Sequence, residues 1–491
     1  MFSVAAYFRR RGDRPHFRPW ALATPLAVLL ICLPLLRPLR HPAMAGTDEE
    51  LRLASIAALV GHHSGSDTTL AGRLAIDKQN FAARTHVIIV RNHFYSDQMP
   101  MLALLLAGPY WLLHAMGYRM ESYSVLVPYL LTLIAVTLPT GGIAGLIYRM
   151  ARIFELHRKW RAALAAAVVF GTGLISYSVV LNPHVPAAFL VVASVGCLIH
   201  VSASRKPQRG GAWLILSGFC AALAATIDLA AAIFLLPLLL CILTMRVRPL
   251  FRAGGIVFYL LGAAPPLLVH AAIMMHITGN LLPGSMHPEL TAQYAPGYSI
   301  AEGMDPLSEA AAQDSSDNLT DDEETSGLFQ NVWRFTSRIL SSLLGEHGLL
   351  VHFPVVVVGF AGMFAVMHRH WPASTKVLAG ISAIAILGGI LVFALSQQLS
   401  ATAGFGNRWL IVFLPILLFW AGAWLRNKHH AGAWLTVGLL LAFSVAVSLI
   451  GATDPMPRSG YDRYTVVGAM HNLFYPISPI NPTAMAGRYP P

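Results

Sequence analysis

The sequence predicts an all-α, polytopic integral membrane protein with about 11–12 transmembrane helices, and two observations carry this prediction. First, 56% of the 491 residues are hydrophobic and only 12% are charged, about half the charged share of ordinary soluble domains. A soluble chain of this length could not cover its surface with so few charges. Second, the apolar residues gather into runs of about 20, the length that a helix needs to cross a bilayer.

Eleven apolar runs have the length and composition of spanning helices. They begin near Trp20, Tyr123, Ala162, Ala187, Ala212, Ala230, Gly254, Leu349, Val377, Arg408 and Ala431. A further run, residues 101–117, contains Pro109 and follows Pro100, and both prolines disfavour a straight span. We therefore expect this run to form a juxtamembrane helix that lies along the outer interface.

Basic residues set the predicted orientation. Arginines crowd residues 1–18, and with 101–117 kept outside, all later basic loops fall on the same side as this N-terminus. By the positive-inside rule that side is the cytoplasm. The net charge of +11 is therefore attributed to cytoplasmic loops, and we expect no nucleic acid partner.

This topology divides the chain into consecutive parts. They are a cytoplasmic N-terminus 1–18, a membrane module 19–276 with an outer loop 38–122, an outer loop 277–348, membrane helices 349–450 and an outer tail 451–491. Residues 302–324 hold nine acids and no Lys or Arg, which predicts a disordered insert. A calcium site is the sharper alternative, but EF-hand spacing is absent. The first span could also be a cleaved signal peptide, although the long basic leader favours an uncleaved anchor.

Three acids of the first outer loop are candidate catalytic residues: Asp48, Glu49 and Asp97. Asp48 and Glu49 stand at the start of a predicted helix, where the dipole favours negative charge, so a purely structural role is open. A carboxylate held at the outer border could also deprotonate an acceptor hydroxyl or amine. Asp97 or Ser96 could cap the interfacial helix, or their polar segment could bind a head group.

Five further residues are candidates for substrate binding. His184 lies in a turn between two spans, where a lone histidine is most often only a turn residue, and Asp228 lies at the boundary of two apolar runs. Arg408 opens a span at the outer interface and could bind a phosphate, or it could anchor the helix together with the neighbouring tryptophan. Arg91 and Lys78 of the first outer loop could assist.

These features together resemble the GT-C glycosyltransferases, in particular the group of protein O-mannosyltransferases and lipid A aminoarabinose transferases. The resemblance is clearest over residues 47–186, where an outer helix starts with Asp48-Glu49 and an aromatic-Ser-Asp segment, 95–100, ends in proline. Residues 345–350 and 407–415 are similar to motifs of uncharacterised bacterial members. Relatives often carry Asp-x-Pro where this chain has His184-Val185-Pro186, which puts in doubt a metal bound by an acid there.

The resemblance implies that a sugar moves from a polyprenyl-phosphate donor, on the exoplasmic face of the inner or plasma membrane, to a lipid, glycan or protein acceptor. Asp48 would be the base, and Asp97 or Glu49 would orient the acceptor or bind a divalent cation, the one cofactor suggested. The enzyme would be a hexosyl- or pentosyltransferase, with membrane lipids around it. One alternative is a transporter or flippase, but such proteins usually carry ionisable residues near the bilayer midplane, and the spans of this chain carry almost none. The other alternative is a scaffold protein without catalytic activity.

Overall fold

The computed structural model describes residues 19–36, 48–61, 72–76, 87–91, 93–120, 126–203, 210–244, 249–287, 290, 328–345, 348–395, 405–427, 429–453 and 455. The predicted N-terminus 1–18, the acidic insert 302–324 and Lys78 lie outside these residues, as does the tail beyond residue 455. The backbone of Asp48 is described, but its side chain is not.

Helices make up most of the described chain, as expected. In chain order they are α2 (Pro19–Cys32), α3 (Asp48–Val60), α5 (Met101–Ala115), α6 (Leu126–Thr132), α7 (Leu138–Met150), α8 (Arg158–Phe170), α9 (Leu174–Tyr177), α10 (His184–Ala203), α11 (Gly210–Ile227), α12 (Leu229–Ala232), α13 (Leu235–Thr244), α14 (Pro249–Ile277), α16 (Leu328–Leu344), α17 (Leu349–His352), α18 (Val356–His368), α19 (Ala373–Leu395), α20 (Leu414–Phe419), α21 (Ala421–Leu425) and α22 (Ala431–Thr453). A π-helical segment, Leu133–Thr137, joins α6 to α7, and a 3-10 turn, η9 (Arg408–Leu410), precedes α20.

Each of the eleven predicted apolar runs contains a helix, so the polytopic helical fold is confirmed. Fewer of them than predicted are long continuous helices. Within the described chain, six are long and apolar enough to cross a membrane, or seven if a pair bent by 98° between α17 and α18 counts as one span. Prolines stand at two of the interruptions, since Pro354 separates α17 from α18 and Pro415 follows the first residue of α20.

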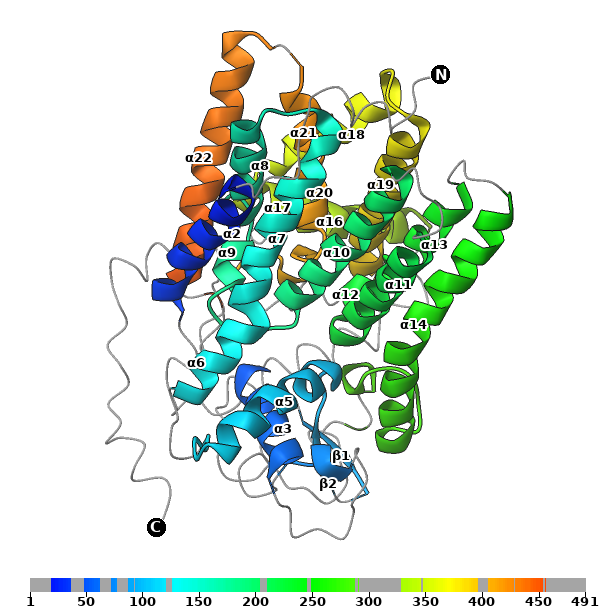
Figure 1. Cartoon of the computed structure of the whole chain (residues 1–491). Coiled ribbons are helices and arrows are strands. Elements are labelled where there is room, and N and C mark those ends of the chain that lie inside the picture. The colour runs from blue at the N-terminus through cyan, green and yellow to red at the C-terminus, as the bar shows by residue number, and fades with distance from the viewer. Residues whose placement is uncertain are drawn as a thin grey trace.

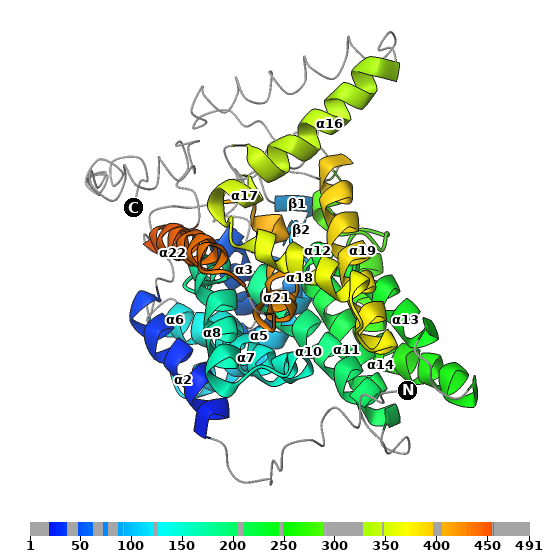
Figure 2. The same ribbon diagram turned by 90° about the horizontal axis from the view of Figure 1, so that it is seen from above.

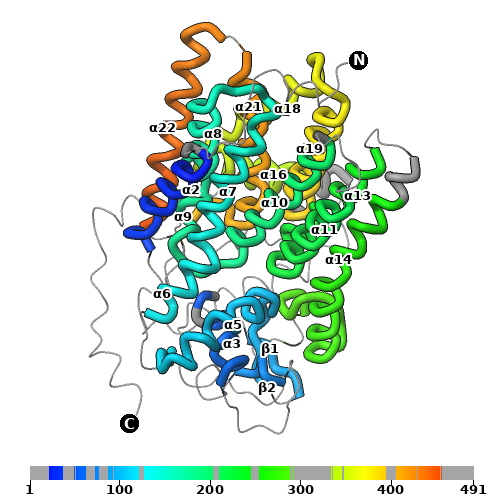
Figure 3. The backbone as a smooth tube through the Cα atoms, viewed as in Figure 1, coloured from blue at the N-terminus to red at the C-terminus, as the bar shows by residue number. Residues whose placement is uncertain are grey.

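The long helices pack side by side through small residues, with α10, α11 and α14 on one side and α2, α7, α8 and α22 on the other (Figure 3). A Cβ atom at Gly218 of α11 would lie 1.9 Å from the carbonyl oxygen of Tyr259 in α14. A Cβ atom at Gly262 of α14 would likewise lie 1.9 Å from the carbonyl oxygen of Ile215. The two backbones therefore touch where only glycine fits, which is how helices achieve close packing in lipid.

Between α2 and α6 in the sequence, α3, α5 and a β-hairpin form a separate group at one end of the bundle (Figure 1). The hairpin pairs β1 (Val87–Val90) with β2 (His93–Ser96) antiparallel, with Val87 opposite Ser96. Leu51 of α3, Ile76, Val87 and Phe94 form a small apolar core beneath it. This hairpin was not predicted from the sequence, because its apolar stretch is too short to stand out from a loop.

Two helices, α5 and α16, are less enclosed by the bundle than the others. α5 has only 15 residues and leaves Leu105, Trp111 and Leu112 exposed. These apolar side chains suit an interfacial helix, and that placement stays a prediction. α16 projects away from the body in the view from above, whereas α17 and α18 return to it (Figure 2).

Candidate functional site

The start of α3 is attached to the turn that precedes α10. Glu49 is 7% exposed, and its Oε1 accepts a hydrogen bond of 3.2 Å from the backbone N–H of Leu181. Asp48, the neighbouring residue, is the first residue of α3. The predicted acidic pair therefore begins its helix at the turn that carries His184.

Asn182 fixes the shape of that turn. Its Oδ1 accepts a hydrogen bond of 3.1 Å from the backbone N–H of Val185, in the first turn of α10. Its Nδ2 donates to the carbonyl oxygens of Tyr177 and Val180. A side chain that satisfies the first helical N–H in this way defines where the helix begins, so Asn182 sets the position of His184.

His184 and Asp228, predicted separately, form one pair. His184 Nδ1 lies 2.6 Å from Asp228 Oδ2, and each residue is only 3% exposed. Asp228 separates α11 from α12, and its Oδ1 accepts a hydrogen bond of 3.0 Å from the N–H of Ala230, which caps α12. The imidazole is therefore buried against an ionisable partner, and its predicted role in substrate binding stays a prediction.

Aromatic rings surround the imidazole of His184. The ring of Tyr177 meets it edge-on at 6.2 Å and that of Trp409 at 5.6 Å between centroids. The Tyr177 hydroxyl donates a hydrogen bond of 2.9 Å to the carbonyl oxygen of Phe405, which holds the chain just before η9. The guanidinium of Arg408 lies 5.2 Å from the centroid of the Trp409 ring. Arg408 is thus brought to the His184 side of the bundle through its neighbour.

The two C-terminal motifs that resembled GT-C enzymes also pack together. His352 of α17 is fully buried, with Nδ1 3.0 Å from the carbonyl oxygen of Gly348. Its ring meets that of Phe405 edge-on at 5.2 Å. Gly406 follows with a positive φ of 63°, a conformation that glycine adopts at little cost. These contacts place the described part of 345–350 against the segment that leads to Arg408.

A second group of polar residues lies between α3, the hairpin and α5. Arg52, one helical turn after Glu49, is 5% exposed and donates from Nη2 to Gln98 Oε1 at 2.6 Å. Asp97 is also buried, and its carbonyl oxygen accepts a hydrogen bond of 3.1 Å from the N–H of Ser285 in the segment after α14. This bond ties the segment after the C-terminal end of α14 to the hairpin.

A small pocket opens beside Arg52. Its polar lining comes from Arg52, Ser55, Ser96 and Gln98. Apolar side chains, among them Met274 and Ile277 of α14, form the remaining wall. The lining therefore combines one guanidinium group with apolar side chains.

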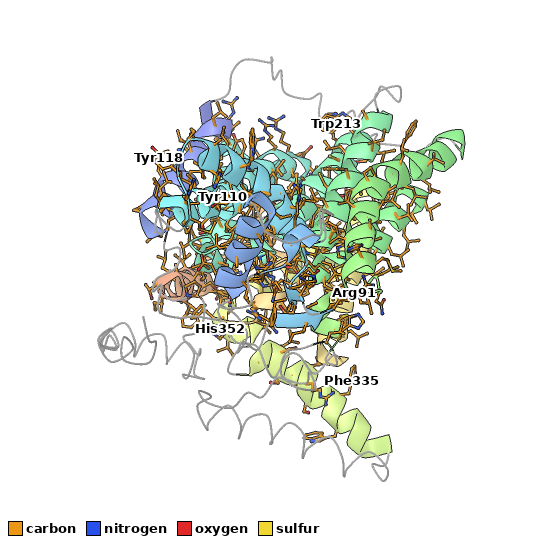
Figure 4. All side chains as sticks on the ribbon, turned by 90° about the horizontal axis from the view of Figure 1, so that it is seen from below. Arg91, Tyr110, Tyr118, Trp213, Phe335 and His352 are labelled. Atoms are coloured by element: carbon orange, nitrogen blue, oxygen red, sulfur yellow. The ribbon has the colours of Figure 1, made fainter. Side chains whose placement is uncertain are left out.

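The remaining predicted residues are placed less centrally. Arg91 occupies the exposed turn of the hairpin with a φ of 51° (Figure 4). Neither Ser96 nor Asp97 caps α5, since its N-cap residue is Pro100 without a side-chain bond, so that alternative is wrong. Among the described residues, no three His, Cys, Asp or Glu side chains gather as metal ligands would.

Three residues of these sites were not predicted from the sequence: Arg52, Gln98 and Tyr177. Arg52 could have been suspected, because a residue three positions after Glu49 lies on a neighbouring face of the same helix. The other two carry no local signal, since their roles depend on contacts across the fold.

Comparison with known proteins identifies similar structures only. No protein-family model matches the sequence, and no curated protein is similar to it. The apo crystal structure of the Archaeoglobus fulgidus oligosaccharyltransferase has a TM-score of 0.50 at 12% identity, over 96% of this chain and 60% of that one. The same enzyme tethered to an acceptor peptide with an NVT sequon gives 0.50 at 14% identity, over 92% and 57%.

A third solved structure, ArnT from Cupriavidus metallidurans bound to undecaprenyl phosphate, has a TM-score of 0.45 at 14% identity, over 92% of this chain and 77% of that one. The present chain spans about three fifths of the length of the oligosaccharyltransferase that it matches. At these identities the likeness concerns the fold, and it confirms the expected GT-C membrane fold.

Proposed function

We propose that this chain, which has the GT-C fold, is a membrane glycosyltransferase that moves a sugar from a polyprenyl-phosphate carrier to an acceptor on the exoplasmic face. The main support is that distant elements bring the acidic start of α3, the His184–Asp228 pair and the Arg408–Trp409 segment into contact. Charge and hydrogen-bonding groups thereby collect around one turn, at the end of α10 that faces the outer-loop group.

The proposed base is Asp48. A carboxylate in the first turn of a helix is stabilised by the dipole and stays ionised, which suits a group that accepts a proton from an acceptor hydroxyl or amine. Glu49 has a different proposed role. Because its carboxylate is buried and accepts the Leu181 N–H, it positions the start of α3.

The reaction is a displacement at the anomeric carbon of the donor. The acceptor oxygen or nitrogen forms a bond to that carbon, its proton passes to Asp48, and the bond from carbon to the carrier phosphate breaks with its electron pair on the phosphate. Negative charge therefore grows on the phosphate, where cationic side chains lower the barrier. Arg408 is the proposed partner near the His184 turn, and Arg52 lines the apolar pocket that suits the carrier itself.

The other predicted residues have supporting roles in this proposal. Arg91, exposed at the hairpin turn, would attract the anionic carrier at longer range, with Lys78 of the same loop. Asp97 would hold the segment after α14 in place through its backbone. Asp97 or Glu49 would also be the residues to hold a divalent cation, although among the described residues no three His, Cys, Asp or Glu side chains gather.

The test is a release assay on purified protein in liposomes. The donors are undecaprenyl-phosphate mannose, glucose and arabinose with radiolabelled sugars, and a membrane extract supplies the acceptors. We expect release of undecaprenyl phosphate from at least one donor, and a fall of about 10²- to 10⁴-fold in rate with Asp48→Asn. The control is Glu155→Gln, an exposed acid paired with Arg426.

Three outcomes would speak against this proposal. Labelled donor that crosses the liposome without release of the phosphate would identify a transporter or flippase instead. Full activity of Asp48→Asn would remove Asp48 as the base. An equal loss with Glu155→Gln would show that the effect is not specific to the start of α3.

A further inference from the structure

The His184–Asp228 pair leaves one imidazole nitrogen for a ligand. Asp228 Oδ1 accepts a hydrogen bond of 3.0 Å from the Ala230 N–H, and Asp228 Oδ2 lies 2.6 Å from His184 Nδ1. Because a carboxylate offers only acceptor atoms, the imidazole proton is assigned to Nδ1. In the neutral ring Nε2 then carries a lone pair. Within the described chain, Nε2 makes no hydrogen bond.

A purely structural link would not need an imidazole at this position. An asparagine could donate to Asp228 from the place of Nδ1, and its shorter side chain would put no atom at the position of Nε2. The His184 side chain is only 4% exposed, yet Nε2 is not among the fully buried polar atoms without a partner, so a ligand atom can reach it. A second polar atom kept here therefore points to a ligand that completes its hydrogen bonding.

The surroundings indicate the chemistry of that ligand. Tyr177 and Trp409 both present their rings to the imidazole, and Arg408 lies against Trp409. Pockets that bind small polar molecules combine such apolar walls with a few placed polar groups. A sugar offers both apolar C–H surface and hydroxyl groups, and a phosphate attached to it would meet the arginine.

We propose that His184, held by Asp228, is a hydroxyl-binding residue whose Nε2 accepts a hydrogen bond from a hydroxyl group of the substrate. The inference rests on the proposed transferase function, in which the donor sugar or the acceptor supplies that hydroxyl. The order Arg408, Trp409, His184 matches phosphate followed by sugar, which favours the donor sugar. Asp228 acts through His184 and is a positioning residue.

Two substitutions of His184 separate the structural bond from the binding atom. His184→Asn keeps a donor at the place of Nδ1 and removes Nε2, whereas His184→Gln places its amide near the position of Nε2 and loses the donor to Asp228. His368→Asn is the matched control, since that exposed histidine also uses Nδ1, at 3.0 Å from the carbonyl oxygen of Phe364.

The measurement is binding in detergent, with two probes compared for each variant. Bare undecaprenyl phosphate has no sugar hydroxyl, and the undecaprenyl-phosphate sugar that supports release has several. For His184→Asn we expect an unchanged melting temperature, unchanged affinity for the bare carrier and a rise of about 10- to 100-fold in Kd for the sugar-bearing carrier. His184→Gln should bind the sugar-bearing carrier better than His184→Asn does.

Transfer kinetics then identify the source of the hydroxyl. A rise in KM for the acceptor alone, with donor binding unchanged, would support the hydroxyl-binding role and assign it to the acceptor. Wild-type affinities and both KM values in His184→Asn would overturn the inference and leave the pair a structural link. If His184→Asn lost as much affinity for the bare carrier as for the sugar-bearing carrier, the inference would be overturned as well.

Asp228→Asn keeps the inference testable if His184→Asn does not fold. The asparagine can still cap α12, but its amide turned toward Nδ1 forces the proton onto Nε2, which then donates instead of accepting. The sugar hydroxyl would then have to accept instead of donate. We therefore expect a change in the affinity for the sugar-bearing carrier with the affinity for the bare carrier unchanged, and the absence of any such selective change would contradict the inference. Failure of the proposed function would be distinguishable, because wild-type protein would then release no phosphate from any donor.

Discussion

Glu49→Ala tests whether the start of α3 is fastened to the His184 turn. The substitution removes the carboxylate that accepts the Leu181 N–H at 3.2 Å, in a place where Glu49 is 7% exposed. A hydrogen bond to a charged group contributes about 1.5–3 kcal/mol, and every 1.4 kcal/mol is a factor of ten in an equilibrium constant. The opening equilibrium at Leu181 should therefore rise by about 10- to 100-fold.

Amide hydrogen exchange measures this change directly. In the regime where exchange follows the opening equilibrium, the peptide that contains Leu181 should exchange about 10- to 100-fold faster in Glu49→Ala than in the wild type. Glu49→Gln keeps a neutral acceptor and should give a smaller increase. Peptides of α22, which lies apart from α3, are the internal control. Unchanged exchange at Leu181 in Glu49→Ala would refute the connection between α3 and the turn.

Two further substitutions test the packing and the pocket. Gly218→Val forces a side chain against the carbonyl of Tyr259, so the free energy of unfolding should fall by about 1–3 kcal/mol or more and the melting temperature should fall with it. Gly438→Val is the control, because nothing lies within 4 Å of a Cβ atom at that position and the melting temperature should not change. Equal melting temperatures would contradict the contact between α11 and α14. Arg52→Ala removes the cation that lines the pocket and should raise the Kd for bare undecaprenyl phosphate about 10- to 100-fold. The Kd of Arg52→Lys should lie between those of the wild type and Arg52→Ala. Binding as tight as in the wild type would separate the pocket from the carrier.

The helical membrane fold could be predicted from the sequence because repeated apolar runs of bilayer length are rarely compatible with a soluble fold. The number of long helices could not be predicted, since prolines and glycines inside several runs divide them in ways that depend on packing. The hairpin of residues 87–96 could not be predicted from the sequence either, because its strands are short and its core is completed by Leu51 and Ile76 from other segments.

The candidate site shows the same division between local and long-range information. His184 and Asp228 were each noticeable as ionisable residues beside apolar runs, but they are 44 positions apart, and only the packing of α10 against α11 pairs them. Arg408 was recognisable at the start of a span, whereas its approach to His184 depends on the Trp409 ring. The role of Arg52 required the hairpin, because Gln98 is its partner.

The proposed function requires that sugar transfer takes place at the exoplasmic rim, with α3, the hairpin and the His184 turn on that side of the membrane. The most direct measurement is labelling of single cysteines in intact cells with a membrane-impermeant maleimide. The native cysteines Cys32, Cys197, Cys220 and Cys241 are buried, so they should add little background. We predict that Arg91→Cys in the hairpin is labelled in intact cells, and that Glu155→Cys, in the loop between α7 and α8, is labelled only after lysis. The reverse pattern would contradict an exoplasmic site.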